Sequence, residues 1–318
     1  MRSSRWSATI SRPTTSCPAR WTRASARRWL RRSRKPRESE PLTRRLVVAL
    51  VALLIAGCSG GSAPPSIAVG ATDDPQSALL AQLYAAALRY YGSPAHVETS
   101  DDPVGDLDTR DVLVAPGLTG RLLTRFDPNS TARAPEQVYR AMIGALPEGI
   151  AAGDYAQSAD DGPAVAVTEQ TAEAWGGSDV TALARTCGRP NAGAVVGAVT
   201  PRAVGSCRLP EPREFRDQTA LFAALQSGRI DLAWTSTAAA DVPDWAVVLT
   251  DRTSLIRAEN VVPLYRRNEL TEQQVLALNQ IAGELDNGAL ADMLRQVGDG
   301  KDPAALAGDW LSSHPLGH

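Results

Sequence analysis

The sequence predicts an α/β fold in which helices flank mixed or parallel sheets. From residue 66 onward, short runs rich in Val and Ala alternate with longer stretches whose Leu and Ala residues recur at helical spacing. Gly, Pro and Asp residues separate the two kinds of segment. Alternating strands and helices favour parallel sheets with helices on both faces. In such sheets a ligand binds beyond the carboxyl ends of the strands.

The elements of the first half follow from apolar runs and helix-start signals. Asp74 followed by Pro75 is typical of a helix start, and leucines at helical spacing come after it. We expect, in order, a strand within 66–74, a helix from Asp74 to near Gly92, a buried strand at 111–116 and a helix at 134–146.

The second half repeats the alternation. Thr271 and Gln274 have the spacing of a capping box, which predicts a helix start at Thr271. Strands are expected at 162–168, 192–199, 245–251 and 260–267, and helices at 171–175, 178–186, 272–285, 288–297 and 303–313, with a helix, Gly turn and strand together at 218–237.

A short apolar run near the N-terminus has the features of an export signal. Arg44 and Arg45 precede an unbroken apolar stretch of twelve residues, 46–57, and Cys58 follows it. A membrane-spanning helix needs about 20 apolar residues, whereas the apolar core of a secretory signal has about 7–15. The sequence IAGC at 55–58 resembles the lipobox of bacterial lipoproteins, in which the cysteine receives a diacylglycerol and begins the mature protein.

The segment before this signal has no pattern of a folded domain. Residues 1–40 are rich in Arg, Ser and Trp and have no helical or strand period. Signal peptides begin within a few residues of their charged start, so we expect the natural start codon to lie downstream of the printed one. Within the leader 1–57, residues 41–57 are then the signal peptide, and the Ser, Gly and Pro residues of 58–65 are a lipidated tether.

Removing the leader changes the charge of the chain. Residues 1–57 contain 14 of the 33 Lys and Arg residues and two of the 35 Asp and Glu residues. The mature chain then has 19 basic and 33 acidic residues, a formal charge of −14. Nucleic acid requires a basic surface, so a nucleic-acid partner is excluded.

The cysteines and histidines predict a disulfide and no metal site. Cys187 and Cys207 are 20 positions apart in a chain that the signal marks for export. We expect a disulfide between them, worth roughly 3 kcal/mol in the chain-entropy model, and the alternative is two buried free thiols. After the leader only His96, His314 and His318 remain, too few for a metal site, and no cofactor is expected.

Several segments resemble, in matching order, the substrate-binding proteins of ABC importers for osmoprotectants such as glycine betaine, choline, carnitine and proline. The similarity extends over roughly 66–316. Three segments are each similar to a family motif: LVAPGLTG (113–120) to DLYPEYTGT, DDGPAVAV (160–167) to NNTYALAV, and LFAALQSGRIDLAWTSTAAAD (221–241) to ALKNGEIDV. The opening strand and helix of the family correspond to IAVGATDDPQSALLAQLYAAAL (67–88). The later segments VVLTD, ENVVPLYRR and KDPAALAGDWL also match in order.

The resemblance implies a two-lobed periplasmic-binding-protein fold of type II, a "Venus flytrap". The first lobe is expected at 66–160 plus 245–318 and the second at 161–244. The implied protein is a monomer, anchored by lipid to the extracytoplasmic face of the cell membrane. It captures a small organic solute in the interlobe cleft and delivers it to a permease, and through that to an ATPase subunit.

The family's aromatic cage for a quaternary ammonium has few counterparts here. The Tyr of PEYTG corresponds to Leu118, and the Asp and Tyr before it to Leu113 and Ala115. The Tyr of NTYAL corresponds to Pro163, and the aromatic residue after the GRIDL-like segment to Ser236. Aromatic residues make up only 5% of the chain. A neutral, hydroxyl-rich or aromatic solute is therefore the alternative to a quaternary ammonium.

Polar residues at the expected strand ends are the remaining ligand-binding candidates. Carboxylates there can hold a cation or a hydroxyl, and hydroxyl groups can donate or accept hydrogen bonds. Ordinary turn and cap chemistry is the alternative for each of them. The candidates, with the adjoining apolar positions, are Gln76, Leu118, Thr119, Asp160, Asp161, Trp234, Thr235, Ser236 and Thr237.

Enzyme classes with sequence signatures are not indicated. The chain has no Ser-x-x-Lys, His-Glu-x-x-His or Gly-x-Ser-x-Gly motif and no phosphate-binding glycine loop. We therefore expect no enzyme. The competing interpretations are a lipoprotein that senses a ligand without transporting it, and a structural protein whose lobes close on no ligand.

Overall fold

The computed structural model describes residues 65–187 and 189–317, and residues from Ala63 to the C-terminus form one compact unit. The predicted leader, the predicted lipidation site Cys58 and most of the predicted tether lie outside the described residues. In the described part of the chain, no helix is both long and apolar enough to span a membrane.

The first sheet is mixed, with strand order β2-β1-β3-β12-β4. β1 pairs in parallel with β2 and β3, whereas β12 runs antiparallel to both β3 and β4. The strands are β1 (Ile67–Ala71), β2 (Ala95–Thr99), β3 (Val114–Leu118), β4 (Ile150–Ala152) and β12 (Val261–Arg266).

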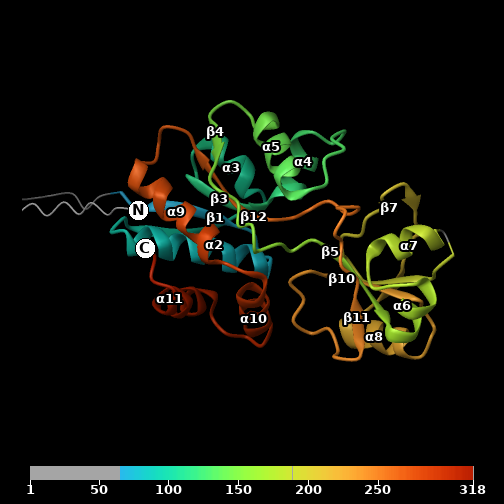
Figure 1. Ribbon diagram of the computed structural model, residues 1–318. Helices are drawn as coiled ribbons and strands as arrows, with labels where there is room; N and C mark the ends of the chain where they lie inside the picture. Colours follow the sequence, from blue (N-terminus) through green and yellow to red (C-terminus); the bar gives the residue numbers. More distant parts are fainter. Residues whose placement is uncertain (1–64, 188, 318) are drawn as a thin grey trace, which may run out of the picture. The chain divides into compact units, whose positions relative to one another are not determined.

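Helices cover both faces of the first sheet (Figure 1). Neighbouring residues of β12 point to opposite faces, so Val261 packs with one helix layer and Val262 with the other. The first layer is α2 (Pro75–Tyr90), α9 (Glu272–Glu284), α10 (Asn287–Gly298) and α11 (Pro303–Ser313). The second is α3 (Pro103–Thr109), α4 (Thr119–Phe126) and α5 (Pro135–Ala145).

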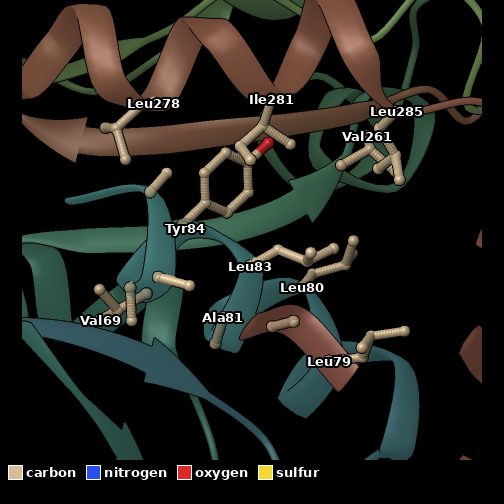
Figure 2. Close-up of a cluster of buried hydrophobic side chains, with 14 of the residues drawn as sticks. Val69, Leu79, Leu80, Ala81, Leu83, Tyr84, Val261, Leu278, Ile281 and Leu285 are labelled. Atoms are coloured by element: carbon tan, nitrogen blue, oxygen red, sulfur yellow. The ribbon is translucent and has the colours of Figure 1, made fainter. Parts of the chain in front are cut away.

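The helix α2 is buried along most of its length, because the sheet and helices α9, α10 and α11 surround it. Figure 2 shows its Tyr84 beside Ile281 of α9, and Leu79 and Leu83 belong to the same buried cluster. The predicted helix start is confirmed, since the Asp74 side chain accepts a hydrogen bond from the Ser77 N–H at 3.0 Å. The capping box at Thr271 is confirmed as well.

The second sheet is also mixed, with strand order β11-β5-β10-β6-β9. β6 is parallel to β10 and β9, and β5 is antiparallel to β10 and β11. The strands are β5 (Pro163–Thr168), β6 (Ala192–Val195), β9 (Arg213–Phe215), β10 (Leu232–Ser236) and β11 (Ala246–Val248), and a hairpin of β7 (Ala203–Val204) and β8 (Cys207–Arg208) stands apart.

Helices also cover both faces of this second sheet. Trp234 of β10 packs on the face shared with α6 (Glu169–Trp175) and α7 (Val180–Thr186). Its neighbour Ala233 packs on the face shared with α8 (Gln218–Gln226). The prediction of two mixed or parallel sheets flanked by helices is confirmed.

Two segments connect the sheets. The first crossing, residues 153–162, leads from β4 to β5, and the second crossing, residues 249–260, leads from β11 to β12. They meet at an isolated antiparallel bridge between Asp160 and Asn260. The expected return to the first lobe at residue 245 is wrong, because Ala246–Val248 pairs with β5 in the second sheet.

Other differences from the predicted elements are local. The strand expected at 192–199 ends at Val195, because residues 196–199 turn away from the sheet and are exposed. The helices α3 and α4 were not predicted from the sequence. The start of α4 at Thr119 has no side-chain cap within its own segment, so no local signal marks it.

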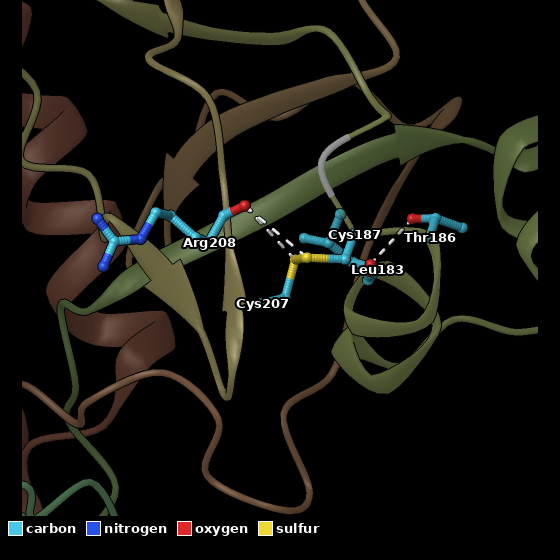
Figure 3. The surroundings of a disulfide bond; sticks show 5 residues. All are labelled: Leu183, Thr186, Cys187, Cys207 and Arg208. Atoms are coloured by element: carbon cyan, nitrogen blue, oxygen red, sulfur yellow. Dashed lines mark hydrogen bonds between the residues drawn. A yellow bond between two sulfur atoms is a disulfide. The ribbon is translucent and has the colours of Figure 1, made fainter.

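The structure contains the expected disulfide between Cys187 and Cys207, whose Cα atoms are 5.4 Å apart (Figure 3). Cys187 directly follows α7 and Cys207 begins β8, so the bond ties the hairpin to the end of that helix. Cys207 is buried and belongs to the core beside Trp234.

We predict that replacing both cysteines (Cys187→Ser with Cys207→Ser) lowers the free energy of unfolding by about 2–4 kcal/mol, because the unfolded chain gains conformational freedom. Urea denaturation measures the change. Reducing agent should destabilise the wild type to the same extent and leave the double variant unchanged. Equal stability of the oxidised wild type and the double variant would contradict the structural role of the bond.

Candidate functional site

A cavity of about 190 Å³ lies where the two crossings meet the second sheet. We call it the Asp161 cavity. Arg121 and Glu259 line it from the side of the first sheet, and Thr235 and Ser236 from β10. Since β6 and β10 are parallel, their carboxyl ends lie at one edge of the sheet, and the cavity lies at that edge.

Asp161 connects elements of both sheets. Its Oδ2 accepts a hydrogen bond from Nε2 of Gln76 on α2 at 2.5 Å, and its Oδ1 accepts one from the Ser236 hydroxyl at the end of β10. Burial raises the pKa of the Asp161 carboxyl, and the positive charge of Arg121 opposes this rise. The carboxylate is thus fixed in place, and a ligand in the cavity can reach it.

Glu259 caps the start of α4 from the second crossing. Its Oε2 accepts a hydrogen bond from the backbone N–H of Arg121 at 2.7 Å. A Cβ at Gly120 would meet Ala258 O at 2.5 Å, so only glycine allows this close approach. Burial raises the pKa of Glu259 to about 7, although the N–H groups of Arg121 and Gly120 favour the charged form.

Two polar atoms on the side of the second sheet have no partner among the described residues. They are Oγ1 of Thr235 and Oε1 of Gln218, both buried in residues that line the Asp161 cavity. Buried polar groups in proteins are nearly always hydrogen-bonded, so unpaired ones at a cavity wall need an explanation. A bound solute would supply the missing partner.

Arg121 contributes the one guanidinium in the lining. Its side chain is exposed, and within the described ranges it forms no ion pair shorter than 4 Å. It also lines a neighbouring cavity of about 290 Å³ beside the first sheet, which we call the Gln76 cavity. Gln76 and Leu118 lie in the wall of that second cavity.

Asp160, Thr119 and Thr237 lie outside both of these cavities. Thr119 is fully buried, and its hydroxyl accepts a hydrogen bond from the Asn260 N–H at 3.0 Å. The Thr237 hydroxyl donates to Asp160 O at 2.7 Å. These residues hold the crossings together, and Asp160 and Thr237 line a separate cavity of about 220 Å³.

The structure therefore divides the sequence-predicted set. Asp161, Trp234, Thr235 and Ser236 meet at the Asp161 cavity, and Gln76 joins them through its bond to Asp161. Trp234 is only 3% exposed and belongs largely to the core. Sequence reasoning missed Arg121, Gln218 and Glu259. The only local signal for Glu259 was a charged residue near the start of β12, separated from its apolar run by Asn260.

No group of three or more His, Cys, Asp or Glu side chains within residues 65–187 and 189–317 is arranged to hold a metal ion. The site consists instead of two carboxylates, one guanidinium, hydroxyl groups and an amide. This set can bind a small polar solute by hydrogen bonds and charge.

Comparison with known proteins identifies a family. Residues 65–313 match the family described as the substrate binding domain of the ABC-type glycine betaine transport system. No curated protein matches the sequence.

Solved structures share the fold at low identity. A glycine betaine/carnitine/choline ABC transporter protein is 14% identical over 78% of this chain and 98% of its own, with a TM-score of 0.64. YehZ from Escherichia coli, in its apo form, is 19% identical over 79% and 99%, with a TM-score of 0.61. A choline-binding protein in complex with choline is 17% identical over 79% and 89%, with a TM-score of 0.50. The expected type II periplasmic-binding-protein fold is confirmed.

We predict that Glu259 makes stability depend on pH. Its pKa of about 7 in the folded protein lies above its ordinary value of about 4.5, so the folded state binds the proton more tightly than the unfolded state. The resulting stabilisation is complete below pH 4.5 and is lost as the pH rises through 7.

The measurement compares the wild type with Glu259→Gln in urea denaturation between pH 5 and pH 8. The wild type should lose about 2 kcal/mol more than the variant over this range. Glu284→Gln, at an exposed position of α9, controls for the loss of one charge. Parallel profiles for the wild type and Glu259→Gln would show that Glu259 does not titrate as stated.

Proposed function

Because the chain belongs to the family of substrate-binding domains of ABC-type glycine betaine transport systems, we propose that the Asp161 cavity is where it captures its solute. The bound solute is then delivered to the permease of an ABC importer. This family consists of transport proteins rather than enzymes, and no catalytic role is assigned to any residue here.

The Asp161 cavity is chosen because residues beside both sheets line it. A solute in it would touch Arg121 and Glu259 beside the first sheet and Thr235 and Ser236 in the second. Asp161, between them, already bonds to one residue from each side. Binding there would favour the arrangement in which both sheets contact the solute.

The two crossings act as the hinge in this proposal. Among residues 65–187 and 189–317, the chain passes between the sheets only at 153–162 and 249–260. Backbone rotation in these segments can move one sheet with its helices relative to the other. The lobes proposed are therefore residues 66–160 plus about 257–318, and about 161–256. The core of the second lobe includes Leu249 and Ile256, which supports the later return.

The first solutes to test come from the family and from the similar structures. The family description names glycine betaine, and one similar structure holds choline. Both are small, and both carry a positive charge that Asp161 and Glu259 could face.

The protein is proposed to work on the extracytoplasmic face of the cell membrane as a monomer, held by lipid on Cys58. Two acyl chains on one residue give stable membrane attachment. The tether would keep the binding protein near its permease at high effective concentration.

We predict that the solute stabilises the protein when it is purified in the processed form that the cell produces. A solute at 100 times its dissociation constant adds about 2.7 kcal/mol to the free energy of unfolding. A thermal-shift screen of betaines, choline, carnitine, amino acids, amines, sugars, polyols and aromatic compounds measures this. Absence of any shift across these classes would contradict the proposed function.

The variant Asp161→Asn should then weaken binding of the identified solute about 10- to 100-fold, because a hydrogen bond to a charged group contributes about 1.5–3 kcal/mol. Isothermal titration calorimetry provides the affinities. Asp309→Asn, at an exposed position of α11, is the matched control and should bind like the wild type. Unchanged affinity of Asp161→Asn would place the solute elsewhere.

The lipid anchor has its own test. Cys58→Ala should move the protein from the membrane fraction to the soluble fraction and abolish incorporation of radiolabelled palmitate, because the variant has no thiol to acylate. Ser59→Ala, which keeps the thiol, should leave both unchanged. Palmitate incorporation into Cys58→Ala would disprove the assignment of the anchor.

A further inference from the structure

The lining of the Asp161 cavity can accept more hydrogen bonds than the described residues donate to it. The Asp161 carboxylate accepts one bond from Gln76 and one from Ser236. The Glu259 carboxylate accepts the N–H of Arg121 and is also close to the N–H of Gly120. An ionised carboxylate has about four acceptor positions. Both side chains therefore have free acceptor positions for hydrogen bonds where they line the cavity.

The lining also has more negative than positive groups. One guanidinium, that of Arg121, faces two carboxylates. Burial raises the pKa of both carboxyl groups, which means that neither charge is fully compensated by its surroundings. A positively charged group on the solute would compensate them.

The wall formed by the second lobe also contains acceptor atoms that lack a hydrogen-bond donor. Oε1 of Gln218 and Oγ1 of Thr235 are buried, and no described residue bonds to either. Both atoms can accept a hydrogen bond. The Thr235 hydroxyl can also donate, but Oε1 of Gln218 can only accept, so a solute that cannot donate would leave Oε1 of Gln218 unpaired, at a cost in binding free energy.

Aromatic rings, by contrast, are nearly absent from the site. Among the residues that line the Asp161 cavity and the Gln76 cavity, Trp234 is the only aromatic one. It is 3% exposed and packs among the core residues of the second lobe. A cation attracted by ring faces needs them within about 6 Å, and favourable cages use several rings. The site therefore offers acceptors in place of ring faces.

On the premise of the proposed function, we infer that the solute carries its positive charge on a nitrogen that keeps N–H bonds. A primary or secondary ammonium group, or a guanidinium group, has this property. A quaternary ammonium group has no N–H to donate to Asp161, Glu259, Thr235 or Gln218, so compounds of that class bind poorly.

Matched pairs of compounds test this inference without knowledge of the natural solute. The pairs are proline with its N,N-dimethyl betaine, ethanolamine with choline, sarcosine with glycine betaine, and 4-amino-3-hydroxybutyrate with carnitine. Each pair differs mainly in the methylation of one nitrogen. Calorimetric titration of the whole processed protein gives the affinities of both members of each pair. The pair that contains the tightest binder is the one that tests the inference.

The N–H-bearing member of that pair should bind at least about tenfold more tightly, the effect of one hydrogen bond to a charged group. Equal or tighter binding of the quaternary member overturns the inference while leaving the proposed function intact. Failure of every N–H-bearing member to bind overturns it as well, and the wider solute screen then decides the proposed function separately.

Two variants link the preference to the site. Thr235→Val keeps a β-branched residue in β10 and removes the hydroxyl, and it should weaken the N–H-bearing compound about tenfold while changing the quaternary one little. Thr219→Val, at the exposed neighbour of Gln218, is the control and should change neither. Circular dichroism checks the folding of both variants. Equal weakening of both compounds by Thr235→Val would contradict the assigned contact.

Discussion

The position of the Asp161 carboxylate is the constraint on which the rest of the site depends. Asp161 belongs to the first crossing, and its N–H donates to Glu259 O of the second crossing at 3.0 Å. Its side chain bonds to Gln76 of α2, which packs on the first sheet, and to Ser236 at the end of β10 in the second sheet. Four segments of the chain thus converge on one half-buried acid. Because burial makes its charge costly, a cationic solute is the natural complement to it.

The second carboxylate, Glu259, links the cavity to the first lobe in a different way. It supplies the cap that α4 lacks locally, so the start of that helix and the position of Arg121 depend on the second crossing. Movement of the second crossing would therefore shift the position of Arg121. The Asp160–Asn260 bridge and the bond between Thr119 and Asn260 hold the same junction from the other side.

The sequence predicted what depends on local pattern. The helix after Asp74, the capping box at Thr271 and the apolar run of β5 were found because cap residues and apolar spacing are local. The start of α4 was missed because its cap lies 138 positions away. The partner of β11 was also missed, since pairing with β5 is a tertiary contact. In the site, Asp161 and Thr235 were recognised at strand ends, but Arg121 and Gln218 carry no motif.

A crystal structure with bound solute would show directly whether Asp161 and Thr235 hold it. The protein would be crystallised with the tightest-binding compound of the solute screen. We expect the compound in the Asp161 cavity, with hydrogen bonds to Asp161 on the first crossing and to Thr235 in the second lobe. A compound bound outside this cavity, or one that contacts residues of a single lobe only, would contradict it.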